Sequence, residues 1–293
     1  MRSLLITGIS GLLGGHFCRH EKAGWQLWGT YHHHPVMTPY VKALPLDLTT
    51  PESIHAVWQQ VHPDAVIHTA ALSKAGICQQ QPEHSHQINV AGTLALAQRC
   101  AQAEIPFIFT STDLVFDGTA APYSESDRPN PVNTYGEHKA LAEAQILACY
   151  PAATICRLPL LLGAATATAQ SFVQPLLQAI ATQTSQTLFI DEIRTPAAVS
   201  DVVQGLYLIL DQGVTGIWHL GGCQRLNRYE LGLLIADSFQ VSPASLRPGQ
   251  QSEVNLTTPR PPDVSLNSQK AFALGYRPQP LEQALAAIAH TTA

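Results

Sequence analysis

The chain has 293 residues, of which 45% are hydrophobic and 13% are charged, and its formal net charge is −5. This composition excludes intrinsic disorder, and the length allows a sizeable buried core. Acidic and basic residues are mixed along the chain, so no basic stripe indicates a nucleic-acid partner. No apolar run reaches the roughly 18 residues of a membrane span. The short apolar start fits a buried strand better than a signal peptide, so we expect a cytoplasmic protein.

Strand and helix patterns alternate through the first half of the chain. We expect strands at 4–6, 26–31, 43–46, 65–68, 107–110 and 154–158. We expect helices at 12–23, 51–61, 84–103 and 134–149. Such alternation is typical of a parallel sheet covered by helices on both faces. The predicted fold class is therefore α/β, a Rossmann-type doubly wound parallel sheet with a smaller C-terminal substrate-binding lobe.

The pattern loosens after residue 163, where prolines and glycines become common. Short strands are expected at 188–190 and 217–220, and helices at 199–210 and 229–239. We assign residues 1–163 to a dinucleotide-binding Rossmann domain and 164–293 mainly to a substrate-binding lobe. Because there is no obvious linker, the second lobe is expected to pack directly on the first. Later segments are also expected to return to the first domain.

Six cysteines are present, and none forms a C-x-x-C pair. A zinc knuckle or a dithiol motif is therefore unsupported, and reduced thiols in a cytosolic protein are expected.

A glycine-rich loop at residues 7–14 follows the first predicted strand and opens the first helix. Gly8 permits a tight turn, Gly11 lets the backbone approach a pyrophosphate, and Gly14 lets the helix pack close to the sheet. The helix N-terminus would face the phosphates. The alternative is a purely structural turn. The loop residues assigned to the cofactor are Gly8, Ser10, Gly11, Leu12, Leu13 and Gly14.

The end of the second strand usually contacts the adenosine ribose, and NAD-binding proteins often place an acid there. No acid lies between Thr30 and His34, which removes the repulsion against a 2′-phosphate, although no arginine is present either. We therefore expect NADP(H) in preference to NAD(H), with Tyr31 and His32 beside it. A metal site is one alternative for the histidine run, but it lacks evident partner ligands, so no metal is predicted. Solvated loop histidines are the other alternative.

Tyr135 and Lys139 lie four residues apart on a predicted helix, which places them on one face. The charge of Lys139 is expected to lower the pKa of Tyr135 and prepare it to protonate a carbonyl. Ser111 and Thr112 lie at the carboxyl end of the preceding strand, where a hydroxyl would bind a substrate oxygen that gains charge. The alternative is that these hydroxyls cap a turn.

Several motifs occur in a recognisable order along the chain. They are Thr7-Gly8-x-x-Gly11-x-x-Gly14, Asp47-Leu48, His68-Thr69-Ala70-Ala71, Asn89-Val90-x-Gly92-Thr93, Ser111-Thr112-Asp113-Leu114-Val115-Phe116-Asp117-Gly118, Tyr135-Gly136-x-x-Lys139, Arg157-Leu158-Pro159 and Arg260-Pro261. With them the chain resembles the extended short-chain dehydrogenases/reductases, most closely the dTDP-4-dehydrorhamnose reductase group. The run from Ser111 to Gly118 is the most specific of these motifs.

The resemblance implies roles for individual residues. Tyr135 would protonate the carbonyl oxygen, Lys139 would assist it and hold the nicotinamide ribose, and Thr112 would fix the substrate carbonyl. The further residues assigned to the cofactor are Asp47, Leu48, Ala70, Ala71, Leu72, Asn89, Thr110, Leu158 and Pro159, of which Asn89 is also expected to brace the sheet.

The expected substrate is a small molecule with a ketone, such as a nucleotide-linked 4-keto-6-deoxy sugar. Arg194 and Arg260 would then pair with its diphosphate, because guanidinium binds phosphate bidentately; the alternative for each is a surface ion pair. Neither a nucleic acid nor a membrane is an expected partner, and a homodimer is left open.

The resemblance also leaves a second function open. Leu114 stands where the sugar-nucleotide reductases usually have tyrosine. The regulatory β subunits of methionine adenosyltransferase share the pattern and bind NADP while serving a partner enzyme, so a cofactor-binding subunit with little catalysis is the competing hypothesis.

Overall fold

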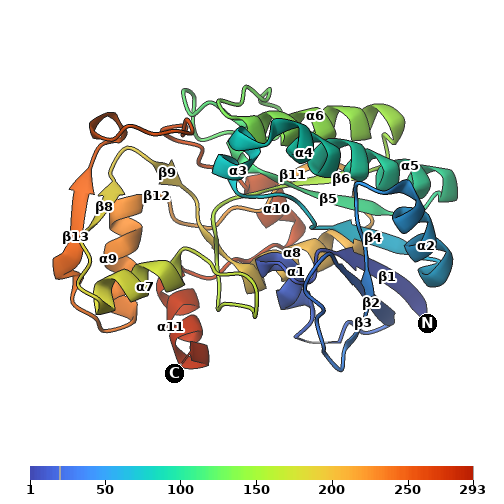
Figure 1. The fold of residues 1–293 in the computed structure, drawn as a ribbon, viewed down its shortest axis with the longest axis horizontal. Coiled ribbons are helices and arrows are strands. Elements are labelled where there is room, and N and C mark those ends of the chain that lie inside the picture. The colour runs from blue at the N-terminus through green and yellow to red at the C-terminus, as the bar shows by residue number, and fades with distance from the viewer. Residues whose placement is uncertain (20, 293) are drawn as a thin grey trace.

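The computed structural model describes residues 1–19 and 21–292 and contains a central sheet of seven parallel strands (Figure 1). The strands are β1 (Arg2–Thr7), β2 (Trp25–Tyr31), β3 (Val41–Pro45), β4 (Ala65–His68), β5 (Phe107–Thr112), β6 (Thr154–Leu158) and β11 (Gly216–His219). Their order in the sheet is β11-β6-β5-β4-β1-β2-β3. The order reverses between β1 and β4, which is the topological switch point of a doubly wound sheet. The predicted α/β Rossmann-type fold is confirmed.

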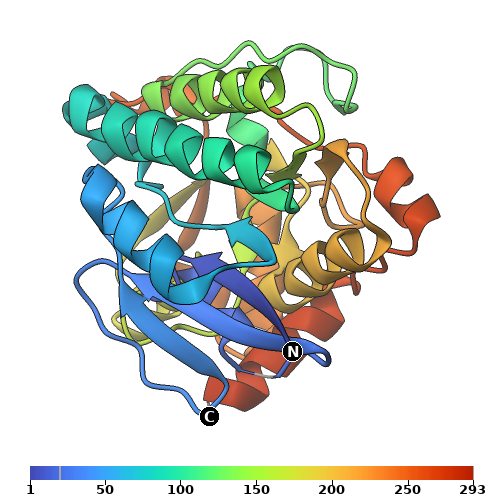
Figure 2. The same ribbon diagram turned by 90° about the vertical axis from the view of Figure 1, so that its right-hand side faces the viewer.

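Helices cover both faces of this sheet because successive side chains of each strand point to opposite faces. Leu4 and Ile6 face α1 (Leu12–Phe17) and α8 (Val199–Gln212). Leu5 faces the other layer, formed by α2 (Pro51–Val61), α5 (Thr93–Ala103) and α6 (Thr134–Cys149). Figure 2 shows α5 and α6 running side by side over the sheet. The strands read as continuous apolar runs because both faces are buried.

A smaller lobe lies beside the carboxyl ends of the strands (Figure 1). It contains the parallel pair β8 (Gln186–Phe189) and β13 (Leu246–Gly249), with α7 (Val173–Ala181), α9 (Arg228–Ser238) and α11 (Leu281–Thr292) around a core of their own. In contrast, β11 pairs with β6 and α10 (Gln269–Leu274) contacts β11, so these later segments lie in the larger lobe.

Short elements connect these layers. They are α3 (Ala75–Gln80), α4 (Pro82–His86), a π-helical segment (Gln87–Gly92), two-residue strands β7 (Leu161–Leu162), β9 (Ile193–Arg194), β10 (Ala197–Ala198) and β12 (Leu226–Asn227), and single 3₁₀ turns at Asp113–Val115, Pro243–Ser245 and Gln251–Glu253. Within the two described ranges, no helix combines the length and hydropathy needed to cross a lipid bilayer.

Two helices differ from expectation. The helix predicted over 12–23 ends at Phe17, after the adjacent helix-weakening glycines Gly14 and Gly15. The helix predicted over 84–103 is three consecutive segments, with a π-helical turn in the middle. That turn ends at Gly92, where a Cβ atom would lie 2.6 Å from the carbonyl oxygen of Leu48. The loop after β3 therefore passes directly against the π-helical turn, a tertiary contact that helical periodicity does not report.

Candidate functional site

A cleft of about 1280 Å³ runs along the carboxyl ends of the strands, which is where ligands bind in open α/β sheets. Nearly all of the predicted site residues line it. Those lining the cleft are Gly8, Ser10, Gly11, Leu12, Leu13, Gly14, Tyr31, His32, Asp47, Leu48, Ala70, Ala71, Leu72, Thr110, Ser111, Thr112, Tyr135, Lys139, Leu158, Pro159 and Arg194. Asn89 and Arg260 do not.

The glycine loop needs its glycines for backbone packing. Gly8 has φ +74°, and a Cβ atom there would lie 2.7 Å from the Cα of Ala70. A Cβ atom at Gly14 would lie 2.2 Å from the carbonyl oxygen of Gly8. In the part of the chain that the structure describes, the backbone N–H groups of Ser10, Leu12 and Leu13 have no acceptor. This row of unpaired donors along the cleft suits an anionic ligand such as the pyrophosphate of a dinucleotide.

The end of the cleft next to β2 carries an acid, Asp47, which is one of the residues assigned to the cofactor. The rings of His32 and His33 lie 3.6 Å apart between centroids, and both line the cleft. Asp47, which follows β3, lies 3.8 Å from Nε2 of His32. Its carboxylate accepts hydrogen bonds from the hydroxyl and backbone N–H of Thr49, and these lower the pKa of Asp47. No acid lies at the end of β2, as the sequence shows, but Asp47 lies just after the neighbouring strand β3 and places a carboxylate beside His32.

Tyr135 and Lys139 are positioned by α6. Asn133 caps this helix by accepting a hydrogen bond from the N–H of Gly136 at 3.0 Å. Nζ of Lys139 donates to the carbonyl oxygen of Thr110 at 2.7 Å and lies 3.8 Å above the ring centroid of Phe109. Burial lowers the pKa of Lys139 to about 7, against the opposing charge of Glu143. The amine can therefore change its protonation state near neutral pH.

The pKa of Tyr135 differs from expectation. Burial raises it, and the neighbouring Cys78 and Asp113 raise it further, whereas Arg194 is the group that lowers it. The predicted lowering of the pKa of Tyr135 is therefore wrong for this structure. The physical reason is that removing a phenolate from water costs more than the nearby positive charge recovers.

The hydroxyls of Ser111 and Thr112 have different surroundings. Thr112 caps the 3₁₀ turn that follows β5, accepting from the N–H of Leu114 and donating to Asp113, both at 3.2 Å. The turn-capping alternative thus applies to Thr112. Oγ of Ser111 is buried and has no hydrogen-bond partner among the residues of the two described ranges. An unpaired buried hydroxyl in a cleft is a candidate donor to a ligand.

Asn89 braces the cleft from outside. It is fully buried, and its amide oxygen accepts from the N–H of Leu72 at 2.9 Å. Its amide nitrogen donates to the carbonyl oxygen of Leu72 at 3.0 Å and to Oγ of Ser85 at 3.2 Å. The side chain is therefore not placed at the cleft, where a direct contact with a cofactor was expected, and it braces the loop after β4 and not the sheet itself.

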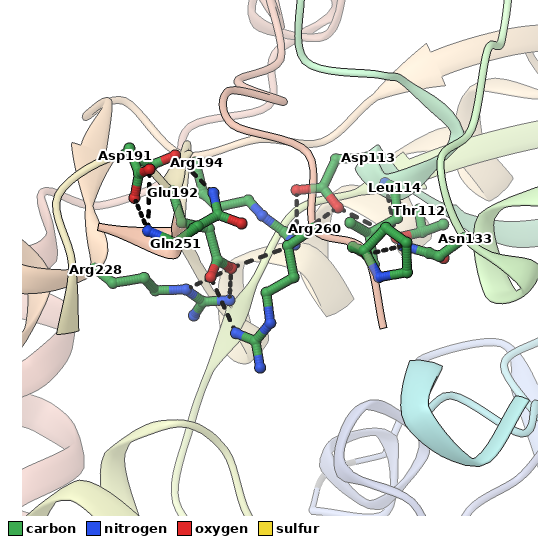
Figure 3. A network of polar contacts seen from close by, with 11 residues as sticks. Thr112, Asp113, Leu114, Asn133, Asp191, Glu192, Arg194, Arg228, Gln251 and Arg260 are labelled. Carbon is green, nitrogen blue, oxygen red and sulfur yellow. Dashed lines mark hydrogen bonds and ion pairs between the residues drawn. The ribbon is translucent and has the colours of Figure 1, made fainter. Parts of the chain in front are cut away.

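The two predicted arginines belong to one ion-pair network (Figure 3). Arg194 donates to both carboxylate oxygens of Asp113, at 2.7 and 2.8 Å. Arg260 donates to Glu192 at 3.0 Å and lines a second cavity of about 340 Å³, which adjoins the cleft. Arg194 is 7% exposed, so the surface ion pair considered for it is replaced by a buried one.

Sequence reasoning missed three members of this network. Arg228 donates to Oε1 of Glu192 at 2.8 and 2.6 Å, and Asp113 pairs with Arg194. Burial alone would raise the pKa of Glu192, but Arg228, Arg194 and Arg260 lower it to about 2. Asp113 stands in the most specific sequence motif, which is a usable signal. Glu192 and Arg228 carry no local signal, because tertiary folding alone brings them to Arg260.

Comparison with known proteins assigns the family. The model described as RmlD substrate binding domain matches residues 1–293. The chain belongs to the RmlD substrate binding domain family. Among curated relatives, methionine adenosyltransferase 2 subunit beta of Rattus norvegicus is 30% identical over 285 residues, covering 94% of this chain and 83% of the relative. A probable low-salt glycan biosynthesis reductase of Haloferax volcanii is 30% identical over 289 residues, covering 97% and 96%.

Solved structures share the fold of this RmlD family member. A dTDP-4-dehydrorhamnose reductase of Clostridium acetobutylicum superposes with a TM-score of 0.86 at 22% identity, covering 99% of both chains. A dTDP-4-dehydrorhamnose reductase of Bacillus anthracis, in complex with NADP, gives 0.85 at 20% identity, covering 98% of this chain and 99% of that one. A hypothetical dTDP-4-dehydrorhamnose reductase of Sulfolobus tokodaii gives 0.80 at 26% identity, covering 93% and 94%.

Proposed function

We propose that this RmlD family member is an NAD(P)H-dependent reductase of a ketone, with a nucleotide-linked 4-keto-6-deoxy sugar as the substrate class. One observation carries the proposal: Tyr135, Lys139 and the unpaired hydroxyl of Ser111 line the same cleft as the glycine loop. The likeness to a glycan biosynthesis reductase and to dTDP-4-dehydrorhamnose reductases supports this substrate class.

The cleft fits a nicotinamide dinucleotide, with NADP(H) proposed over NAD(H). Ser10, Leu12 and Leu13 would hold its pyrophosphate through their unpaired N–H groups, and Tyr31 and His32 would lie beside the adenosine ribose. Lys139 would hold the nicotinamide ribose. When bound, the cofactor supplies the hydride. The apolar side chains that would border the adenine, the groove and the nicotinamide are Leu48, Ala70, Ala71, Leu72, Leu158 and Pro159.

Tyr135 would deliver a proton to the carbonyl oxygen of the substrate as that oxygen gains negative charge. Its raised pKa keeps the proton on the hydroxyl until the reaction begins. A charged Lys139 would stabilise the resulting tyrosinate. Ser111 would donate a hydrogen bond to the same carbonyl oxygen. Thr112, whose bonds to Leu114 and Asp113 orient this region, would fix the substrate carbonyl. Arg194 and Arg260 would face the diphosphate.

Tyr135→Phe tests the proposal, because it keeps the ring and removes only the proton donor. NADPH oxidation with a panel of nucleotide-linked keto-sugars should fall by on the order of 10²–10⁴-fold, the usual contribution of a positioned acid. The affinity for NADPH should stay unchanged, as measured by titration calorimetry. Undiminished turnover in Tyr135→Phe would refute the mechanism.

A regulatory subunit is the second candidate function. It is favoured by the 30% identity to methionine adenosyltransferase 2 subunit beta over 94% of the chain and by Leu114, an apolar residue that lines the cleft beside Thr112. This candidate predicts NADPH binding by the parent protein with no ketone reduction across the whole panel. It also predicts that Tyr135→Phe leaves binding to a partner enzyme intact.

A further inference from the structure

A strap of nine residues lies against the glycine loop. It consists of residues 163–171, which connect β7 to α7, the first helix of the smaller lobe, and its residues 166–171 line the cleft (Figure 1). The sequence placed this segment in a lobe assigned mainly to the substrate. The structure instead places the middle of the strap in contact with the loop proposed to hold the cofactor.

The strap has a fixed shape of its own. At its base, the hydroxyl of Ser171 and the side-chain amide of Gln174 donate to the carbonyl oxygen of Gly163, at 2.8 and 2.9 Å. Within it, the N–H of Thr166 donates to the carbonyl oxygen of Ala169 at 2.8 Å, and the N–H of Ala169 donates to Oγ1 of Thr166 at 3.0 Å. These bonds hold the threonines of the strap in place without a contribution from a ligand.

Two threonine hydroxyls of the strap converge on one carbonyl of the glycine loop. Thr168 donates to the carbonyl oxygen of Ser10, and Thr166 donates to the same oxygen at 3.4 Å. A carbonyl oxygen has two lone pairs, so it can accept from both hydroxyls. The negative end of this carbonyl dipole is therefore bonded to the strap and is not free to turn toward an anion in the cleft.

The same peptide group is also held at its nitrogen. The N–H of Gly11 donates to the carbonyl oxygen of Gly8 at 3.0 Å. Within residues 1–19 and 21–292, the neighbouring N–H groups of Ser10, Leu12 and Leu13 have no acceptor. The strap and the turn at Gly8 thus fix the loop with three donors free for a ligand. Fixing donors before binding lowers the entropy that is lost on binding.

A second contact holds the strap against α1. A Cβ atom at Gly15, within α1, would lie 2.6 Å from Cγ2 of Thr166. Carbon atoms in ordinary contact are about 3.5–4.0 Å apart, so a larger residue at this position would displace the strap. Glycine weakens a helix relative to alanine. The contact with the strap therefore explains Gly15, whereas the helix itself does not.

We propose that the strap is part of the dinucleotide site and that Thr166 and Thr168 are positioning residues for the pyrophosphate. They would hold the carbonyl of Ser10 away from the two phosphates, so that the pyrophosphate meets only the N–H groups of the loop. The inference rests on the proposed function for the identity of the ligand. Because NADPH and NADH carry the same pyrophosphate, loss of the strap contact should weaken the binding of both by the same factor.

Thr168→Val tests the hydroxyl, because it keeps the size of the side chain. NADPH and NADH should each bind roughly 2- to 10-fold more weakly in calorimetry, which is the net contribution of one hydrogen bond. The loss should lie in faster release, measured by stopped-flow displacement of bound NADPH. Thr168 is exposed, so the midpoint of urea unfolding of the cofactor-free protein should stay unchanged. Thr168→Ser retains the hydroxyl and should keep the parent affinity.

Gly15→Ala tests the contact from the side of α1. The added methyl group should displace the strap and weaken both dinucleotides by a similar factor, although alanine strengthens a helix. Thr166→Ser removes the Cγ2 atom that this methyl group would meet, and it keeps the hydroxyl that bonds to Ser10. The double variant with Gly15→Ala and Thr166→Ser should therefore bind both dinucleotides as the parent does, which a general effect on α1 would not produce.

Thr184→Val is the matched control. Thr184 is an exposed threonine of the smaller lobe, its hydroxyl pairs with that of Thr182 at 2.9 Å, and it lies outside the cleft. Its substitution should leave both affinities unchanged. The inference is overturned if Thr168→Val keeps the parent affinities, if Thr168→Ser loses as much as Thr168→Val, or if the double variant binds as weakly as Gly15→Ala. The Thr168 variants decide the question alone if Gly15→Ala fails to fold.

These outcomes are separable from failure of the proposed function. Tyr135→Phe should retain the parent affinity for NADPH, since its hydroxyl does not contact the strap. NADPH binding that depends on Thr168, without any ketone reduction, would refute the reductase and leave the strap. Ketone reduction with no effect of Thr168→Val on binding would refute the strap and leave the reductase. A parent protein that binds neither dinucleotide would refute both.

Discussion

Burial moves the pKa of Tyr135 upward and that of Lys139 downward, so in both cases the neutral form is favoured. Both pKa values are shifted from their ordinary range by the same cause, which is the removal of the side chain from water. A neutral tyrosine keeps its proton available for donation. A lysine with a pKa of about 7 is charged in only part of the molecules at neutral pH, so the support it offers a tyrosinate should decline as the pH rises.

Lys139→Met should change how stability depends on pH. The unfolded chain holds the Lys139 proton up to the ordinary pKa of 10.5, while the folded protein holds it only up to about 7. Between these values the unfolded state binds more protons, so this group makes the free energy of unfolding rise with pH, by at most about 1.4 kcal/mol per pH unit. Urea unfolding at several pH values within this window should show the parent gaining on the variant. A constant difference between them would contradict the lowered pKa.

Cofactor preference depends on His32 and its surroundings. We expect NADPH to bind more tightly than NADH, because no acid at the end of β2 repels a 2′-phosphate, and His32 can donate to it. His32→Gln should weaken NADPH binding by roughly tenfold or less and leave NADH binding unchanged, because the contact is partly exposed. Calorimetry measures both. His55→Gln, an exposed histidine on α2 outside the cleft, is the control. A clear preference for NADH in the parent would show that Asp47 dominates this end of the cleft.

At the scale of elements, α6 is fixed to the sheet by a buried ion pair. Arg157 of β6 donates to Glu143 of α6 through Nη2 at 2.7 Å and through Nε at 3.1 and 3.2 Å. Both side chains are at most 3% exposed. Glu143 lies one helical turn beyond Lys139, so this pair sets the height of α6 over the sheet and thereby the position of Tyr135 and Lys139 in the cleft.

Glu143→Gln should therefore be strongly destabilising. Breaking a buried pair leaves an uncompensated charge on Arg157 and costs about 3–5 kcal/mol in the free energy of unfolding. Asp211→Asn is the matched control, because Asp211 forms an exposed pair with Lys22 that should contribute no more than about 1 kcal/mol. Denaturant unfolding measures the loss of unfolding free energy in both variants. An equal loss in the two would show that the buried pair contributes little to stability.

Sequence patterns predicted the strands of the large lobe well because each is a short apolar run ended by glycine, proline or a polar residue. Local patterns also predicted that Tyr135, Lys139 and Ser111 lie at one cleft, because the carboxyl ends of parallel strands meet at one edge of the sheet. The π-helical turn before α5 could not be predicted, because it depends on the close approach of Leu48 to Gly92. The pKa of Tyr135 was predicted with the wrong sign because spacing reports neighbours on a helix and not burial.

At the scale of the whole molecule, segments from both lobes line the cleft. Thr166 and Thr168, from the segment after β7, donate hydrogen bonds to the carbonyl oxygen of Ser10 in the glycine loop. The arginine network spans the lobes as well, since Asp113 follows β5 while Arg228 begins α9. The sequence could not predict these contacts because their members are far apart in the chain, and Thr166, Thr168 and Arg228 belong to no local pattern.

This arrangement predicts that the two ligands protect different parts of the molecule from amide hydrogen exchange. NADP⁺ should slow exchange in residues 8–14 and in 166–169, because the glycine loop and the segment bonded to it lose their freedom to open. Addition of dTDP to the NADP⁺-saturated protein should slow exchange in the segments that contain Glu192, Arg194, Arg228 and residues 256–260, which line the second cavity. The reason is that a ligand that binds these segments only in their folded arrangement raises the free energy of their local opening. Mass spectrometry of peptic fragments measures both effects, with thymidine in place of dTDP as the control. Protection by dTDP confined to the seven-stranded sheet and its helices would show that the smaller lobe does not bind the substrate.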